Sequence, residues 1–408
     1  MAERHAIAGP DPPGPAGDPG NVDRKRKVNM RMDARSSRIP DARLRPETTF
    51  TEYTIPTLKR LLAATGLDAE SGAATVRNML ASWGDQPIGT EPIWGSFITT
   101  DTSPVEFSAA FGRTGTEVRV CVEAQPSRAT TADAQDTASR LTRRLVDHAG
   151  ISTRKLDVIR DLFLPEQDAH GWAMAHAVGL SEKSAPAFKV YLNANASPAM
   201  TPDDRVRAAL ERLGFGRVWE PLRAFADRGS DLDPVVYISL DLSDAPDARV
   251  KVYFLHRHIT PALWDSKLAA FPEHRAGSVE EFATELTRYT GAQPVITNFT
   301  FTARGGQRPE SATAYVPLWH YVPNDQVACD RVRRALATHE IPDQDYQALL
   351  AQVARKPLDE SWGIHSFASM RTGRSGSPIT VYLSPMFYGK SLITRREITE
   401  LFPDLDET

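Results

Sequence analysis

Cysteine is scarce in this chain of 408 residues, which contains only Cys121 and Cys329. Two cysteines exclude a disulfide framework and a zinc site built from cysteine, and they are typical of a reducing cytoplasm. No stretch approaches the roughly 18 consecutive apolar residues that a transmembrane helix requires. Neither sign of charge dominates, because 48 basic residues stand against 52 acidic ones. We therefore expect a cytoplasmic protein that has neither nucleic acid nor membrane as a partner.

Lysine is also scarce, since only ten of the 48 basic residues are lysine. The position of each lysine is therefore informative.

Residues 1–45 are rich in proline, glycine and charge and contain few large apolar side chains. This composition predicts a disordered N-terminal tail. Residues 46–408 are then expected to form a single domain.

A supersecondary unit repeats along most of the chain. Short strand-like runs occur in pairs, and the second runs of the pairs align on Arg119, Lys189, Lys251, Thr313 and Thr380. These positions are 70, 62, 62 and 67 residues apart. A period near 65 residues indicates one repeated unit rather than several unrelated domains.

The runs predict ten strands. Each first run alternates and is rich in aromatic or β-branched residues; these runs cover residues 96–110, 171–178, 235–242, 295–303 and 363–370. The second runs cover residues 117–123, 188–192, 249–254, 313–317 and 380–384. The gaps between the pairs have room for two helices each. In one gap, Ser278 and Glu281 match a capping box, and Gly291 is expected to end that helix. Leu141 and Leu145 lie on another helix, which Gly150 closes.

The fold class follows from this pattern as α+β, with five β-β-α-α units. Ten antiparallel strands in five hairpins favour a closed barrel surrounded by helices, because closure removes exposed strand edges. In the second runs, polar residues share one face and valines and leucines share the other. Amphipathic helices would cover the apolar face, so the polar face would line a chamber inside the barrel. The alternative is an open sheet whose polar face contacts solvent.

The expected lining of the chamber suggests a chemistry. Arg119, Lys189, Arg249 and Lys251 suit a multiply charged anion such as diphosphate. Four tyrosines add hydroxyl groups and π faces that stabilise a cation; they are Tyr191, Tyr253, Tyr315 and Tyr382. This combination fits an allylic diphosphate that ionises. Glu106, on the first hairpin, is a candidate base toward an N–H group of an acceptor.

These motifs resemble the indole prenyltransferases of the dimethylallyltryptophan synthase family, in a bacterial form. The resemblance spans about residues 50–400 and rests on six motifs in order. They are Thr-Ser-Pro-Val-Glu at 102–106, Val-Arg-Val at 118–120, Lys-Val-Tyr at 189–191, Arg-Val-Lys-Val-Tyr at 249–253, Ala-Tyr-Val-Pro at 314–317 and Val-Tyr-Leu-Ser-Pro at 381–385. It implies the ABBA prenyltransferase barrel and transfer of a dimethylallyl group from its diphosphate to tryptophan or a small tryptophan-derived metabolite. Dimethylallyl diphosphate is then a co-substrate, and no cofactor or metal is required.

The resemblance also implies residue roles. Glu106 matches the glutamate that accepts the indole N–H, and the four basic residues and four tyrosines match the diphosphate clamp and its shield. Ile98 corresponds to a position that contacts the acceptor, and Thr313 to a donor contact for which relatives carry glutamine. His176 is the nearest candidate for the residue that removes the ring proton. The partners implied are small molecules, and the protein is expected to be a monomer or a homodimer.

Three other functions remain open from the sequence. A phenolic or other aromatic acceptor, or a longer geranyl donor, would fit the same chamber. A barrel that binds an aromatic or anionic metabolite without chemistry would also carry these residues. The basic tail could instead serve a non-enzymatic interaction. The sequence contains no Asp-Asp-x-x-Asp motif, which disfavours the magnesium-dependent isoprenoid synthases, and it has no complete P-loop.

Overall fold

The computed structural model describes residues 44–389, except 113–114, 168, 170, 183, 272–273, 307 and 373–377. The predicted tail, residues 1–45, lies outside this part of the chain except for its last two positions. The described residues fall within one compact unit. Among them, no helix combines the length and hydropathy needed to span a lipid bilayer.

Ten strands of the described chain form a closed antiparallel barrel. Each strand pairs with its neighbours in sequence, and β1 pairs with β10 to close the barrel. The strands are β1 (Val105–Gly112), β2 (Gly115–Glu123), β3 (Met174–Ser181), β4 (Ser184–Asn193), β5 (Val235–Asp241), β6 (Val250–Ile259), β7 (Gln293–Phe301), β8 (Ser311–Pro317), β9 (His365–Arg371) and β10 (Ile379–Leu383). The predicted α+β fold with a ten-stranded barrel is confirmed.

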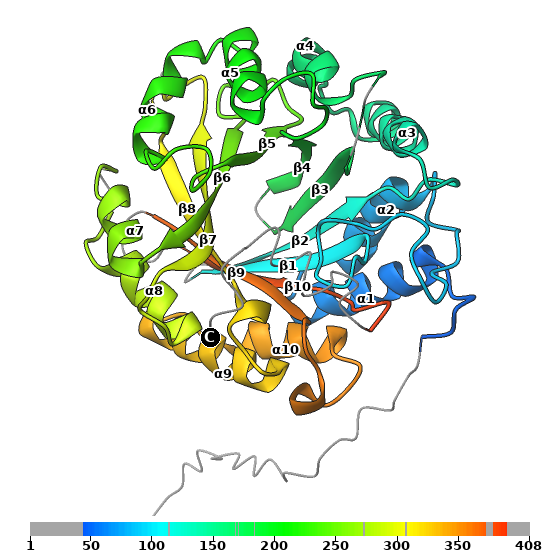
Figure 1. The fold of residues 1–408 in the computed structure, drawn as a ribbon. Helices are drawn as coiled ribbons and strands as arrows, with labels where there is room; N and C mark the ends of the chain where they lie inside the picture. Colours follow the sequence, from blue (N-terminus) through cyan, green and yellow to red (C-terminus); the bar gives the residue numbers. More distant parts are fainter. Residues whose placement is uncertain are drawn as a thin grey trace, which may run out of the picture. The chain divides into compact units, whose positions relative to one another are not determined.

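Helices surround the barrel in pairs (Figure 1). The α-helices are α1 (Phe50–Ala64), α2 (Ala69–Leu80), α3 (Thr131–Ala149), α4 (Arg154–Phe163), α5 (Pro202–Arg212), α6 (Trp219–Phe225), α7 (Pro261–Leu268), α8 (Ser278–Thr287), α9 (Asp325–Thr338) and α10 (Gln344–Val353). Short 3-10 helices are η1 (Gly216–Val218), η2 (Leu318–His320) and η3 (Leu358–Glu360). The first helix pair precedes β1, so the described units follow the order α-α-β-β rather than the predicted β-β-α-α.

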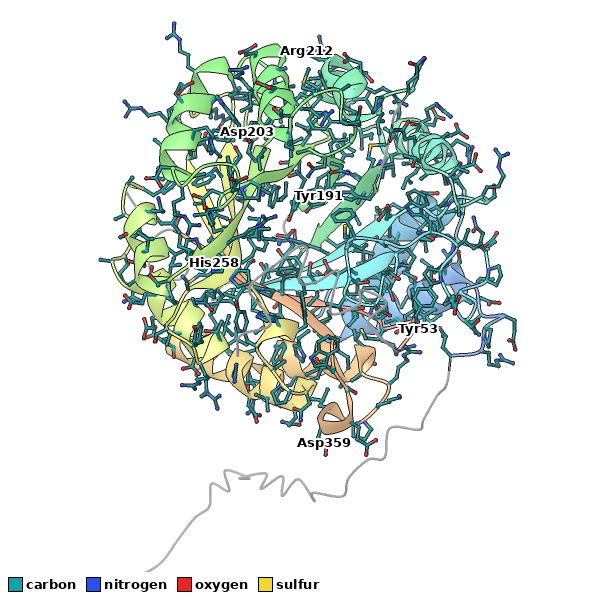
Figure 2. The ribbon with its side chains drawn as sticks, in the orientation of Figure 1. Tyr53, Tyr191, Asp203, Arg212, His258 and Asp359 are labelled. Atoms are coloured by element: carbon teal, nitrogen blue, oxygen red, sulfur yellow. The ribbon has the colours of Figure 1, made fainter. Side chains whose placement is uncertain are left out.

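The hydrophobic core lies between the barrel and the helices. Val118, Val120 and Val122 of β2 are buried, as are Leu141 and Leu145 of α3. The alternate residues of the strands face the other way, into the barrel. Figure 2 shows Tyr191 near the centre of the barrel, whereas Arg212 and Asp359 lie at the periphery. The predicted inversion, with the polar strand face inside, is thus present.

Helix ends test the capping predictions. Gly150 adopts a left-handed conformation (φ 61°) at the end of α3, as predicted. The prediction of a capping box at Ser278 is wrong, because Gly277 is the N-cap of α8 and Ser278 makes no capping bond. Asp265 of α7 instead accepts hydrogen bonds from the backbone N–H groups of Gly277 (2.7 Å) and Val279 (2.8 Å). A carboxylate at a helix N-terminus satisfies the same donors that a serine would.

Two further boundaries differ from the prediction. Helix α8 ends at Thr287, and Arg288 takes the left-handed position that was expected near Gly291. The first strand was predicted from residue 96, but β1 begins at Val105. The intervening residues 94–104 form a loop that lies at one end of the cavity described below.

Candidate active site

A cavity of about 210 Å³ lies inside the barrel. Nine of the predicted site residues line it: Ile98, Glu106, Arg119, Lys189, Tyr191, Lys251, Tyr253, Tyr315 and Tyr382. Strand pairing explains how distant parts of the chain meet here. Ser108 lies opposite Arg119 on one side and opposite Tyr382 on the other, so β2, β1 and β10 present neighbouring side chains to the same space.

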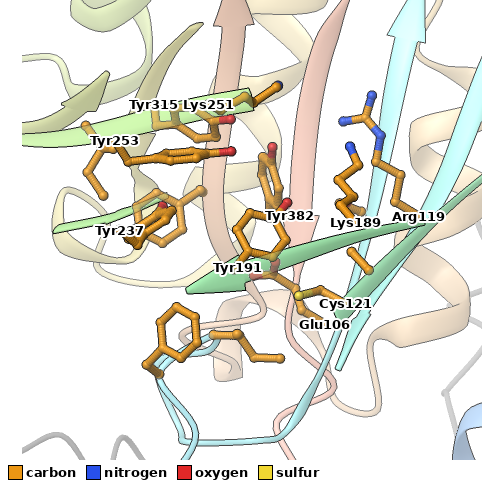
Figure 3. Close-up of a pocket in the computed structure, with 16 residues that line it drawn as sticks. Glu106, Arg119, Cys121, Lys189, Tyr191, Tyr237, Lys251, Tyr253, Tyr315 and Tyr382 are labelled. Carbon is orange, nitrogen blue, oxygen red and sulfur yellow. The ribbon is translucent and has the colours of Figure 1, made fainter. Parts of the chain in front are cut away.

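One end of the cavity is strongly basic. Figure 3 shows Arg119, Lys189 and Lys251 in its upper part. Burial lowers the pKa of Lys189, and with the neighbouring Arg119 and Arg249 it brings that pKa to about 7. Burial, together with Lys189, Arg249 and Arg119, also holds the pKa of Lys251 well below its usual value. Crowded, desolvated cations of this kind attract a polyanion, because the bound negative charge offsets the repulsion between the cations.

Two carboxylates accompany these cations. Glu117 pairs with Arg119 (Oε1 to Nε, 2.7 Å), and Asp241 pairs with Arg249 (Oδ2 to Nε, 2.7 Å). Burial opposes ionisation of Glu117, but Arg119 outweighs it and lowers the pKa of Glu117 to about 2. Arg249 does not itself line the cavity, although its charge acts on both cavity lysines.

A wall of tyrosines fills the middle of the cavity. The rings of Tyr237 and Tyr253 stack with centroids 4.1 Å apart, and Tyr315 lies 6.1 Å from Tyr253 and 5.9 Å from Tyr382. Tyr191 contacts both Tyr237 and Tyr253 at 6.2 Å. Burial raises the pKa of every one of these hydroxyls, so they are neutral at physiological pH. Neutral π faces in a dry cavity stabilise positive charge.

Glu106 is the one carboxylate among the described residues that line the cavity. It lies on β1 opposite Cys121 of β2, and Figure 3 shows the two below the tyrosines. Burial raises the pKa of Glu106 to about 8, against the effect of a hydrogen bond donated by Ser366. A carboxylate with a pKa near physiological pH is suited to proton transfer.

Besides Arg249, two predicted residues do not line the cavity. Thr313 is buried between Asn298 and Arg371 in the sheet but does not line the cavity. His176 does not reach the cavity, and the geometry contradicts its assignment as the base. Its Nε2 lies 2.9 Å from the hydroxyl of Thr142 on α3, outside the barrel. Burial lowers the pKa of His176 to about 3, so the ring is neutral.

His176 points away from the cavity because side chains alternate between the two faces of β3. On β3 the inward positions are odd-numbered, and Ala177 lines the cavity opposite Cys121 and Lys189. His176, one residue earlier, therefore points outward. The β3 wall of the cavity carries no proton acceptor at this position.

Seven lining residues were not predicted from the sequence; they are Phe97, Ser108, Cys121, Ala177, Tyr237, Ile296 and Phe367. Tyr237 could have been found, because residues 235–242 alternate as clearly as the second strands do. Phe97 lies in the loop before β1 and stacks on Trp172 with a centroid distance of 3.5 Å. No periodic signal marks a loop residue of this kind.

The loop that carries Phe97 and Ile98 is anchored by a buried carboxylate. Glu123, at the end of β2, accepts hydrogen bonds from Trp94 Nε1 (3.0 Å) and Ser96 Oγ (2.8 Å). The backbone N–H of Phe97 also donates to it at 3.3 Å. Burial raises the pKa of Glu123 to about 7.

The described part of the chain contains no group of three or more His, Cys, Asp or Glu side chains placed to hold a metal ion.

The sequence model of a protein family described as tryptophan dimethylallyltransferase matches residues 47–348. The chain belongs to this family. The protein is therefore an enzyme, a prenyltransferase that transfers a dimethylallyl group to tryptophan or a small tryptophan-derived metabolite. The earlier resemblance to bacterial indole prenyltransferases is confirmed.

Solved structures of three transferases are similar to this dimethylallyltransferase. A 6-dimethylallyltryptophan synthase from Micromonospora olivasterospora, in complex with DMASPP and Trp, is 29% identical with a TM-score of 0.76. The match covers 83% of this chain and 98% of that one. A 5-dimethylallyltryptophan synthase from Streptomyces coelicolor is 26% identical, with a TM-score of 0.75 and coverage of 84% and 99%. PriB in a binary complex with product diphosphate is 28% identical, with a TM-score of 0.75 and coverage of 83% and 97%.

Proposed function

We propose that this dimethylallyltransferase alkylates the indole ring of L-tryptophan, or of a small molecule derived from it, without a metal in the chemical step. The observation that carries the proposal is the order of groups along one cavity. Cations lie at one end, neutral tyrosine rings in the middle, and a buried carboxylate beyond them. This order matches the charges of a diphosphate, an allylic cation and an indole N–H.

The basic end binds the donor. Arg119, Lys189 and Lys251 pair with the diphosphate, and Arg249, which does not line the cavity, adds its charge. Positive side chains stabilise the negative charge that develops on the leaving diphosphate as the allylic C–O bond breaks. Arginine and lysine thus supply the charge that a metal ion supplies in other diphosphate enzymes.

The tyrosine rings protect the cation until the indole attacks. They exclude water and place π faces beside the positive charge. A ring carbon of the indole then forms the new C–C bond, which leaves the indole positively charged. Glu106, in its ionised form, accepts a hydrogen bond from the indole N–H as the ring attacks. It then takes up the proton that the alkylated ring carbon loses, which restores the neutral aromatic ring. Ile98 and Phe97 contact the acceptor from the loop before β1.

The test is an incubation of the purified enzyme with dimethylallyl diphosphate and L-tryptophan in the presence of EDTA. We expect a product heavier than tryptophan by one C₅H₈ unit in the mass spectrum, together with released diphosphate. The matched control is Glu106→Gln, which keeps the size and shape of the side chain and removes its basicity.

A panel of acceptors and donors makes the test decisive. Phenolic acceptors and geranyl diphosphate are run beside tryptophan and dimethylallyl diphosphate. Prenylation of phenols but not of indoles would overturn the proposed acceptor. Donor binding without diphosphate release, whatever the acceptor, would overturn the chemistry and favour a binding protein. Loss of product in EDTA, restored by Mg²⁺, would overturn the metal-free step.

We also propose that the enzyme acts in the cytoplasm as a monomer or a homodimer. Both cysteines, Cys121 and Cys329, are free thiols, which supports a reducing compartment. Light scattering of the purified chain measures its mass in solution. A tetramer or larger assembly would contradict this part of the proposal.

A further inference from the structure

A buried hydrogen-bond network lies on the outside of the barrel, behind the cavity. Asp325, the first residue of α9, accepts a hydrogen bond from the imidazole Nδ1 of His365 at 2.7 Å. It also accepts the backbone N–H groups of Ile364 (3.2 Å) and His365 (3.0 Å). The hydroxyl of Tyr346 on α10 lies 2.8 Å from His365 Nε2. The proposed mechanism uses none of these groups, yet together they fix the start of β9.

The strand carries a β-bulge immediately after this anchor. Phe367 of β9 lies opposite Tyr382 of β10, whereas Leu383, the next residue of β10, lies opposite His365. Ser366 is therefore an extra residue without a partner in the ladder. In a regular strand Ser366 and Phe367 would face opposite sides of the sheet. Bulges redirect side chains next to active sites in this way.

The bulge turns two consecutive side chains toward the cavity. Phe367 lines it, and the Ser366 hydroxyl donates a hydrogen bond of 2.7 Å to Glu106 Oε1. Ser366 is fully buried and Glu106 is 8% exposed, so bulk water has little access to this bond. The bond reaches across β10, which lies between β9 and β1 in the barrel. It uses one carboxylate oxygen of Glu106, and an indole N–H needs the other.

We propose that Ser366, held inward by the bulge that Asp325 and His365 anchor, is a positioning residue that orients Glu106 toward the acceptor. The inference rests on the proposed function, because it assumes that Glu106 is the group that meets the indole. A hydrogen bond to a buried carboxylate fixes its rotamer and favours its ionised form. Ser366 thus sets both the direction and the protonation state of the base.

Among the groups around Glu106, Ser366 is the one whose hydrogen bond favours the ionised carboxylate. Burial raises the pKa of Glu106 to about 8, and the Ser366 bond is the opposing influence. Other titratable groups that face Glu106 are neutral near that pH, because burial raises their pKa values; they are Cys121 on β2, Tyr237 on β5 and Tyr382 on β10. The charged groups that line the same cavity belong to its basic end: Arg119, Lys189 and Lys251.

The experiment is the pH dependence of turnover in Ser366→Ala. We expect kcat at pH 7 to fall about tenfold or more, because a hydrogen bond to a charged group is lost. We expect turnover to recover as the pH rises, because the base then ionises without the hydroxyl. Ser366→Thr keeps the hydroxyl and should restore the acidic limb of the profile. Inhibition by pyrophosphate should not change in either variant.

Ser369→Ala is the matched control on the same strand. Ser369 also faces the barrel interior, but its hydroxyl lies 3.5 Å from that of Tyr382 rather than on Glu106. The acidic limb of the pH profile of Ser369→Ala should stay at the wild-type position. An acidic limb that does not move in Ser366→Ala, or that moves equally in Ser369→Ala, would overturn the inference.

A second measurement separates this inference from the proposed function. The infrared C=O band of the protonated Glu106 carboxyl is obtained as the difference between wild type and Glu106→Gln, and it is titrated without substrate. We expect the band to persist to higher pH in Ser366→Ala than in wild type. If wild type makes no prenylated product, the proposed function fails while the infrared titration still decides whether Ser366 governs Glu106. An unchanged titration would overturn the role of Ser366 whatever the enzyme catalyses.

Discussion

Glu117 and Arg119 form a two-bond ion pair on the inner face of β2, with Nε to Oε1 at 2.7 Å and Nη2 to Oε2 at 3.1 Å. Gly179 of β3 makes room for it, because a Cβ on Gly179 would come within 2.4 Å of Glu117 Oε1. Asp241 holds Arg249 in a similar way. When both lysines are protonated, the four basic groups at this end exceed the two carboxylates by a formal charge of +2. The donor site therefore contains counter-anions of its own.

The first prediction concerns these counter-anions. Glu117→Gln should strengthen inhibition by pyrophosphate about three- to tenfold, because one negative charge near the bound polyanion is removed. The same change should slow product release, so kcat should fall when release limits turnover. Pyrophosphate inhibition constants at several salt concentrations measure the effect, which should weaken as salt rises.

Two further variants control this experiment. Asp241→Asn removes the other carboxylate and should act in the same direction. Gly179→Ala keeps the charge of Glu117 but forces its carboxylate to move, so it reports on placement alone. Weaker pyrophosphate binding in Glu117→Gln would show that Glu117 serves chiefly to hold Arg119 in position, contrary to the prediction.

Replacement of the proposed base gives the second prediction. Glu106→Gln should lower kcat by about two orders of magnitude or more, as expected for the loss of a general base. Pyrophosphate inhibition should stay at the wild-type level, because Glu106 lies away from the basic end of the cavity. Steady-state kinetics with both substrates separate the two effects. Near-normal turnover would rule out Glu106 as the base.

Donor affinity should depend on pH through Lys189, whose pKa is about 7 in this structure. A bound diphosphate favours the charged form of Lys189, so binding takes up a proton when the pH exceeds that pKa. The inhibition constant of pyrophosphate should therefore rise between pH 7 and pH 9. Lys189→Arg stays charged throughout this range and should show a smaller rise. The ionisation of pyrophosphate itself cancels when the two proteins are compared, and identical pH profiles would contradict the prediction.

The tyrosine wall leads to a prediction about the fate of the cation. Tyr253→Leu should raise the share of donor that is hydrolysed to dimethylallyl alcohol, because a π face is lost and water gains access. The loss of one desolvated ring corresponds to about 1–2 kcal/mol, or roughly a tenfold change in partitioning. Tyr253→Phe keeps the ring, so each diphosphate released should still correspond to one prenylated product. The measurement is the ratio of diphosphate released to prenylated product formed.

Much of the cavity could be predicted from the sequence because strand alternation has a period of two. Lys189 and Tyr191 belong to one face of β4, and Phe188 and Val190 to the other, and the structure keeps this division. The repeat near 65 residues then brought equivalent positions of five hairpins together. Periodic elements carry their own geometry, so a closed barrel and its inner face follow from local pattern.

The remaining features depend on contacts that no local pattern encodes. Ser366 faces the cavity only because a bulge breaks the alternation of β9. Ser278 does not cap its helix because Asp265, from another helix, satisfies the same N–H groups. Phe97 reaches the cavity from a loop that Glu123 anchors at a distance of more than twenty residues along the chain. His176 was the nearest candidate that the resemblance offered for the residue that removes the ring proton, but it directly precedes the inward-facing Ala177 of β3 and so points out of the barrel.

The last prediction follows from that correction and concerns stability rather than turnover. His176 is buried and neutral, and its pKa is lowered to about 3. An unfolded chain binds a proton at this residue below its ordinary pKa of about 6.5, whereas the folded chain does not. His176 therefore costs stability as the pH falls from that value toward 3. His176→Gln removes this contribution, so its thermal midpoint should fall less between pH 7 and pH 5 than that of wild type. At pH 7.5 the variant should keep kcat within about twofold, since the residue touches Thr142 rather than substrate. Differential scanning calorimetry and steady-state kinetics measure both, and a hundredfold loss of kcat in a folded variant would return His176 to the mechanism.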